Sequence, residues 1–152
     1  MMTIWEFSAE LTKRLFTWAI ASIATGAALS FNPNRQQQGV GVQFVGWGVV
    51  NLLIAFLGGH STQRRAQQPN AHEPVTLATE SRNLRRLLWI NTGLDVGYIL
   101  GGLVLARTKG RSDARWRGQG YGIVAQGGFL FFFDLFHALL VGKQDVQLFS
   151  KS

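Results

Sequence analysis

The chain has 152 residues, 47% of them apolar, and a mean hydropathy of +0.10. It contains no cysteine, which excludes disulfides, thiolate metal sites and cysteine nucleophiles. The formal net charge is +7, and the charged residues lie mostly between long apolar blocks rather than within them. This segregation predicts a membrane protein whose basic residues contact anionic lipid headgroups, with no nucleic-acid partner.

Four blocks are long enough to cross a bilayer as helices, which takes roughly 17 to 25 mostly apolar residues. They cover residues 15–31, 41–59, 87–106 and 120–142, and none contains Lys or Arg. We expect one all-α domain over residues 1–152, an integral membrane four-helix bundle. The alternative is a soluble bundle, but this needs a polar outer face on each helix, and the second and fourth blocks have almost none.

The segments outside the blocks differ in character. Apolar residues recur at helical spacing over residues 4–15, which predicts an amphipathic lead-in lying in the membrane interface. The Asn-Pro-Asn sequence at residues 32–34 is typical of a tight turn. Residues 60–83 are polar and hold two prolines, so we expect a long, partly flexible polar loop with a helix starting after Pro74.

Basic residues flank the blocks at both ends. Nine of them are expected to contact lipid headgroups: Arg64, Arg65, Arg85, Arg86, Arg107, Lys109, Arg111, Arg115 and Arg117. Counting all Lys and Arg by side gives nine on the side of the termini and six on the other. Because cytoplasmic loops carry an excess of Lys and Arg, this bias favours a bacterial inner-membrane protein with both termini in the cytoplasm.

The two halves of the chain look like copies of one helical hairpin. An Arg-x-x-x-Trp motif opens the first span at Arg14 and the third at Arg85. This ungapped alignment puts Gly26 on Gly97. Three glycines recur at the same spacing in the second and fourth spans, namely Gly39, Gly41 and Gly48, then Gly118, Gly120 and Gly127. Two copies with an even number of spans are parallel, related by an axis along the membrane normal.

Three ionisable residues lie inside the predicted spans, where charge is costly and side chains usually face the bundle interior. They are Asp95 in the third span and Asp134 and His137 in the fourth. Neutral polar residues share their helix faces. The sequence therefore predicts an intramembrane polar cluster of Asn51, Asn91, Asp95, Tyr98, Gln126, Asp134 and His137. Because the third and fourth spans are antiparallel, Asn91 and Asp134 are expected at similar depth.

Three functions are compatible with this cluster. The first is a structural or accessory membrane subunit whose interhelical hydrogen bonds fix its packing, bound to another membrane protein or to a second copy of the chain. The second is a small transporter or a proton- or ion-conducting protein that uses Asp95, Asp134 and His137. The third is a membrane enzyme acting on a lipophilic substrate, although no nucleophile, phosphate loop or metal motif is recognisable. The first is the preferred hypothesis, with no catalytic residue, metal or cofactor.

Three motifs also relate the chain to a family. W-G-x-x-N covers residues 47–51, R-R-x-L-W-x-N-x-G-L-D-V-x-Y covers residues 85–98, and Q-G-x-F-L-x-x-F-D-x-x-H covers residues 126–137. On these motifs the chain resembles an uncharacterised family of small bacterial membrane proteins. The resemblance covers the last three spans and implies a four-span fold. It implies no activity, because the family has none assigned.

Overall fold

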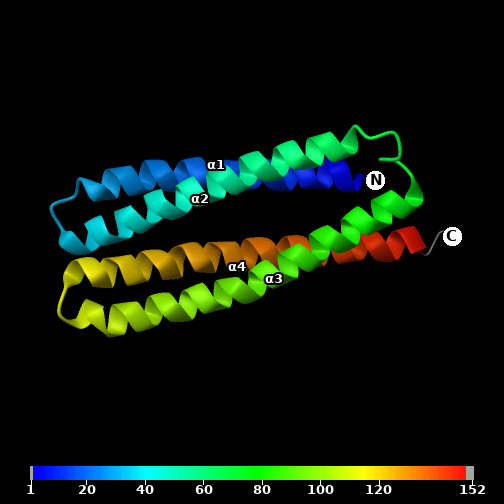
Figure 1. Ribbon diagram of the computed structural model, residues 1–152. Coiled ribbons are helices and arrows are strands. Elements are labelled where there is room, and N and C mark those ends of the chain that lie inside the picture. Colours follow the sequence, from blue (N-terminus) through cyan, green and yellow to red (C-terminus); the bar gives the residue numbers. More distant parts are fainter. Residues whose placement is uncertain (1, 150–152) are drawn as a thin grey trace.

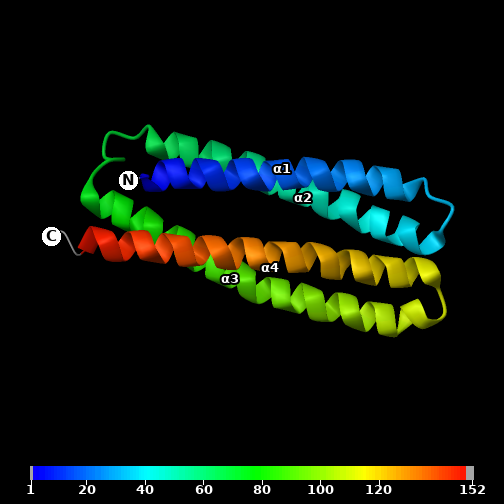
Figure 2. The same ribbon diagram turned by 180° about the vertical axis from the view of Figure 1, so that it is seen from behind.

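The structure, a computed structural model, describes the backbone of residues 2–149 and the side chains of residues 2–142. This part of the chain forms a helical bundle without strands: α1 (Ile4–Ser30), α2 (Arg35–Ala66), α3 (Pro74–Arg107), the short 3-10 helix η1 (Lys109–Arg111) and α4 (Ala114–Phe149). The long helices run alternately up and down (Figures 1 and 2). Both termini and the α2–α3 loop lie at one end, here called the terminal end. The α1–α2 and α3–α4 turns lie at the other, the hairpin end.

Local sequence explains where the helices begin. Thr3 and Glu6 form a capping box at the start of α1. Hydrogen bonds from the Thr3 backbone N–H and hydroxyl hold the pKa of the Glu6 carboxyl below its usual value. Asn34 caps α2 by accepting hydrogen bonds from two backbone N–H groups, which confirms the turn predicted at residues 32–34. Pro74 begins α3, where its missing N–H leaves no bond unmade.

The polar loop predicted for residues 60–83 is much shorter in the structure. α2 continues to Ala66 and α3 starts at Pro74, so only residues 67–73 connect the two helices. The polar composition reflects helix ends with exposed faces, not irregular chain. Both helices therefore extend past their apolar blocks at the terminal end.

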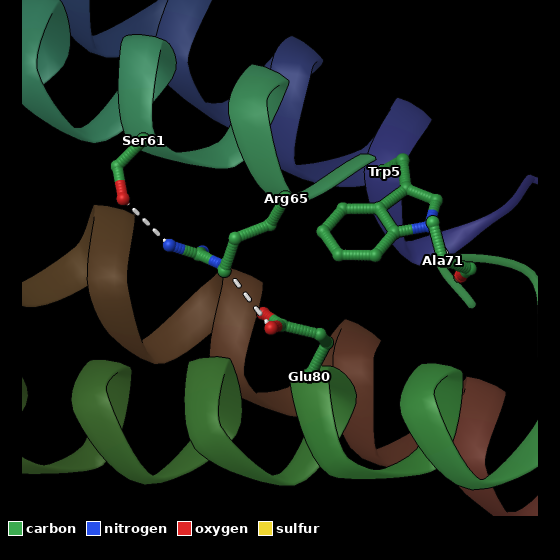
Figure 3. Close-up of polar contacts among 5 residues, drawn as sticks. All are labelled: Trp5, Ser61, Arg65, Ala71 and Glu80. Atoms are coloured by element: carbon green, nitrogen blue, oxygen red, sulfur yellow. Dashed lines mark hydrogen bonds and ion pairs between the residues drawn. The ribbon is translucent and has the colours of Figure 1, made fainter. Parts of the chain in front are cut away.

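The predicted interfacial lead-in is also wrong, because residues 4–15 are the first turns of a continuous α1. Trp5 and Phe7 are buried in the core of the terminal end, together with residues of α3, α4 and the α2–α3 loop. The Trp5 indole N–H donates a hydrogen bond to the carbonyl of Ala71 in that loop at 3.0 Å (Figure 3). The apolar stripe of this segment therefore faces the bundle, since the loop folds over it.

Three of the four helices are long and apolar enough to cross a membrane: α2, α3 and residues 114–142 of α4. α1 does not reach that length, although the sequence predicted a first span over residues 15–31. It ends at Ser30, so only 16 uncharged helical residues follow Arg14. α1 nevertheless packs along α2 over most of its length (Figures 1 and 2).

Glycines bring the two helices of each hairpin into backbone contact. A Cβ atom at Gly26 would lie 2.6 Å from the carbonyl oxygen of Gly41, and one at Gly102 would lie 2.7 Å from that of Gly120. A Cβ atom cannot sit so close to another backbone, so these crossings require glycine. Small residues serve the same purpose wherever helices pack closely in membranes.

The contacts of the first hairpin recur in the second at a fixed distance in sequence. Gly48 of α2 faces Ile23 of α1, and Gly127 of α4 faces Ile99 of α3. Positions in α1 therefore correspond to positions 76 residues later in α3, and positions in α2 to positions 79 residues later in α4. The second value is the register that the glycine spacing of the sequence predicted.

The first value corrects the predicted alignment of Arg14 with Arg85, in which the copies lie 71 residues apart. Gly97, which that alignment paired with Gly26, has nothing within 4 Å of its Cβ position. Gly102 makes the matching contact instead. The repeated Arg-x-x-x-Trp motif is thus a poor guide to register, because it lies away from the contact that fixes the crossing.

The two hairpins meet through α2 and α4, which run parallel (Figure 1). Gly39 of α2 lies against the backbone of Arg115, and Gly118 of α4 lies against the backbone of Gln36. These contacts are reciprocal in the 79-residue register, as expected for two parallel hairpins related by an axis along the bundle. Both views show α2 and α4 closest at the hairpin end and further apart at the terminal end.

The neighbouring residues Gly101 and Gly102 test the importance of the α3–α4 crossing. Gly102→Ala should lower the free energy of unfolding by about 1–3 kcal/mol, because the new Cβ meets the Gly120 carbonyl. Gly101→Ala adds the same atom where nothing lies within 4 Å and should be neutral or slightly stabilising. Thermal unfolding in detergent measures both variants. Equal melting temperatures for the two would contradict the close crossing.

Candidate functional site

A cleft between α2 and α3 contains most of the polar cluster predicted from the sequence. Its inner part is a cavity of about 160 Å³, with α4 and one residue of α1 behind it. Five members of the predicted cluster line it: Asn51, Asn91, Asp95, Tyr98 and Asp134. Trp47, which the sequence analysis did not select, stands beside them, with its ring 4.8 Å from that of Tyr98. Its signal was the four-residue spacing from Asn51, one helical turn.

Asp95 of α3 and Asp134 of α4 form a buried pair in this cavity. Their exposed fractions are 3% and 7%. The Asp134 carboxyl interacts with the side chains of Asp95 and Asn91, as the depth of the two antiparallel helices predicted. Two carboxyl groups form a hydrogen bond only when one of them carries a proton, because a carboxylate has no donor. The pair is therefore arranged to hold one proton between its oxygens.

Two buried polar atoms of the cavity lack a hydrogen-bond partner within the described part of the chain. They are Asn51 Nδ2, a donor, and Asp95 Oδ2, an acceptor. A buried polar group without a partner is costly, and water commonly satisfies it. A cavity of about 160 Å³ has room for several waters, each of which takes roughly 30 Å³. The site can therefore hold water beside the carboxyl pair.

The cleft continues towards the terminal end as a second cavity of about 320 Å³. The two cavities share Leu15 and Ile54 in their walls. At the terminal end of the cleft, the Arg65 Nε donates to Glu80 of α3 at 3.0 Å and its Nη1 donates to Ser61 at 2.6 Å (Figure 3). A partly polar route thus leads from this ion pair towards the carboxyl pair, narrowed by two aliphatic side chains.

Gln126 belongs to a separate hydrogen-bond network, between α4 and α1. It is fully buried, accepts a hydrogen bond from the Trp18 indole N–H and donates one to the Ser22 hydroxyl, both at 3.1 Å. The Trp18 ring stacks on Phe129 with centroids 3.6 Å apart. These contacts fill the space between the two helices and leave no buried polar atom of Gln126 unpaired. Such a network ties helices together and has no room for a ligand.

His137 also faces α1 and lies outside the cleft. Its Nδ1–H donates to the Phe133 carbonyl at 2.6 Å, and its Nε2 accepts a hydrogen bond from Arg14 at 3.3 Å. The sequence placed Gln126, Asp134 and His137 on one face of α4. At 3.6 residues per turn, however, Asp134 points roughly 80° away from Gln126, and His137 only about 20° away. The expected stripe is therefore two, one facing α1 and one facing α3.

The carboxyl pair has an apolar counterpart in the first hairpin. In the register of the glycine contacts, Asp95 corresponds to Ala19 and Asp134 to Ala55. Both alanines are buried, with exposed fractions of 0% and 3%. Asn91 likewise corresponds to Leu15. The same hairpin architecture therefore packs at this level without any carboxyl group.

The basic residues expected at lipid headgroups form two groups, one at each end of the bundle. Arg65 and Arg117 are half-buried and hydrogen-bonded within the protein. Lys109 lies over the Trp116 ring, 4.9 Å from its centroid. The other six side chains are exposed: Arg64, Arg85, Arg86, Arg107, Arg111 and Arg115. Headgroup contact stays a prediction for all nine. Within the described residues, no group of three or more His, Asp or Glu side chains could hold a metal ion.

Residues 14–135 match a family described as a family of unknown function, DUF6992. The chain belongs to this family. The match agrees with the resemblance to an uncharacterised family and extends it to the first hairpin. It contains the cleft with Asp95 and Asp134 but ends before His137. No curated protein and no solved structure matches the chain.

The Gln126 network should contribute measurably to stability. Gln126→Leu removes the partner of the Trp18 N–H and the Ser22 hydroxyl, so we expect a loss of about 0.6–1.7 kcal/mol, the range for interhelical hydrogen bonds in membranes. Gln63→Leu, at an exposed site on α2, is the control and should unfold like the wild type. Thermal unfolding in detergent compares them. An unchanged melting temperature for Gln126→Leu would show that the network does not hold α1 to α4.

Proposed function

We propose that the protein is a four-span membrane protein of the bacterial inner membrane that takes up and releases protons at Asp95 and Asp134, as a proton-conducting or proton-coupled transport protein does. The outer surface of the bundle supports the membrane placement. Large apolar side chains are exposed on every helix, for example Phe16 on α1, Phe56 on α2 and Phe132 on α4. A soluble protein rarely exposes so continuous an apolar surface, whereas lipid tails solvate it well.

α1 is included as a fourth span because of its neighbours. It packs along α2, which is long and apolar enough to cross a membrane. No charged residue lies between Arg14 and Arg35, so the hairpin turn is uncharged as well. A span that is slightly short is accommodated by local thinning of the bilayer and by flanking residues that reach the headgroups. The bias in Lys and Arg places both termini in the cytoplasm.

The observation that carries the proton-exchange proposal is the position of the carboxyl pair in an unfilled cleft. The first hairpin has Ala19 and Ala55 at the equivalent positions, so packing alone does not call for Asp95 and Asp134. Ionisable residues inside a membrane are costly and typically mark proton or ion pathways. A structural subunit, the hypothesis preferred from the sequence, accounts for the saturated Gln126 network. It leaves the carboxyl pair and its two unpaired neighbouring atoms unexplained.

Each part of the cleft has a chemical role in this proposal. Water entering from the Arg65–Glu80 end would bring a proton past Leu15 and Ile54 to the pair. Asn91 beside Asp134 stabilises the charge that remains when the proton leaves. His137 takes no part, although the sequence-based hypothesis included it, because it is hydrogen-bonded on the α1 side of the bundle.

Replacing both carboxyl groups with alanine separates transport from packing. The double variant Asp95→Ala/Asp134→Ala copies the first hairpin, so its melting temperature should equal or exceed that of the wild type. Proton flux into liposomes under a pH gradient, followed with an entrapped pH-sensitive dye, should fall to background. Glu73→Gln, at an exposed carboxyl where α3 begins, should keep wild-type flux.

Two outcomes would contradict the proposal. Flux that is unchanged in the double variant would show that the pair carries no protons. A double variant that no longer folds would show that the pair is needed for packing, and Asp95→Asn/Asp134→Asn, which keeps the shape of both side chains, then decides the transport question alone. Background flux in the folded asparagine variant supports proton exchange, and wild-type flux excludes it.

A further inference from the structure

A groove on the outward face of α4 lies on the opposite side of this helix from the carboxyl pair. It has a volume of about 840 Å³. Its wall is mostly aromatic and contains two small residues: Phe129, Phe132, Phe133, Phe136, Ala125 and Gly128. Nothing lies within 4 Å of the Cβ position of Gly128, so the space above this residue is open. Arg14 of α1 and His137 close the groove at the end nearer the termini.

The length of the groove suits one lipid tail. From His137 to Val124, the last residues lining it on α4, the helix rises about 20 Å at 1.5 Å per residue. One leaflet of the hydrocarbon core is about 15 Å deep, half of the roughly 30 Å of the whole core. An extended acyl chain can therefore lie along the phenylalanines within a single leaflet.

The charge at its end selects the headgroup. Arg14 stands where the charged first turns of α1 give way to the uncharged stretch that continues to Arg35, which is headgroup level in the proposed placement. Its guanidinium contacts His137 Nε2, and no carboxylate of the described residues lies within ion-pair distance of it. A guanidinium binds phosphate oxygens through two parallel hydrogen bonds, so phosphate is its natural partner here.

We propose that this groove binds one anionic phospholipid, with the phosphate on Arg14 and an acyl chain over Gly128 and along the phenylalanines. The proposal rests on the membrane placement proposed above, but it does not depend on proton exchange at the carboxyl pair. A zwitterionic phospholipid offers the same chain and phosphate with a competing positive charge. The groove should therefore prefer the anionic lipid by about fivefold, the effect of one basic residue near the membrane surface.

Native mass spectrometry of the full chain in mild detergent, mixed with equal amounts of phosphatidylglycerol and phosphatidylcholine, measures this preference. The wild type should retain phosphatidylglycerol about fivefold more than phosphatidylcholine. Gly128→Leu fills the groove without meeting other protein atoms and should abolish retention of both. Arg14→Gln should remove the preference for the anionic lipid.

Two matched variants serve as controls. Gly101→Leu places the same side chain at another open glycine, on α3, and Arg86→Gln removes another exposed arginine of the terminal end. Both should retain lipid like the wild type. Equal retention of the two lipids by the wild type, or wild-type retention by both Gly128→Leu and Arg14→Gln, would overturn the inference. Failure of the chain to fractionate with membranes would instead overturn the membrane placement, so the two failures are distinguishable.

Discussion

Backbone contact between glycines near the hairpin end is the constraint on which the rest of the structure depends. Gly26 with Gly41 and Gly102 with Gly120 fix the crossing within each hairpin. Gly39 and Gly118 fix the contact between the hairpins. Helices held this closely at one end separate towards the other (Figures 1 and 2), which leaves one space between α2 and α3 and an equivalent one between α4 and α1. Side chains then decide what each space becomes.

The two spaces give the protein an internal comparison. Between α4 and α1, Gln126 is fully hydrogen-bonded and the stacked rings of Trp18 and Phe129 fill the gap. Between α2 and α3, the corresponding volume holds Asp95 and Asp134 and is left open. One repeated frame therefore carries polar residues of two kinds, which either bind helices together or line a cavity that water can enter. A hydrogen-bonding role explains the first kind, and the second calls for a function.

Sequence reasoning succeeded where the signal is local and failed where it depends on neighbours. The helices were predictable from their apolar blocks, and the proximity of Asn91 and Asp134 followed from the rise per residue of antiparallel helices. The separation of Asp134 from Gln126 and His137 was also within reach, since it follows from the helical angle alone. The register between α1 and α3 was not, because the longer α3–α4 connection shifts it and the contact glycine, Gly102, has no distinguishing sequence feature. Nor could the sequence show that residues 60–66 and 74–83 continue the helices, since their polar faces resemble a loop.

Whether Asp95 and Asp134 share a proton in contact with water is measured most directly by infrared spectroscopy of the protein in lipid. Exposed carboxyl groups are ionised at neutral pH and give no C=O stretch of a protonated acid. The wild type should show that band at neutral pH, and it should shift on transfer to D₂O because water reaches the cleft. The band should be missing from the Asp95→Asn/Asp134→Asn variant. A wild-type spectrum without the band, or a band that persists in the variant or does not exchange, would contradict a proton-holding pair.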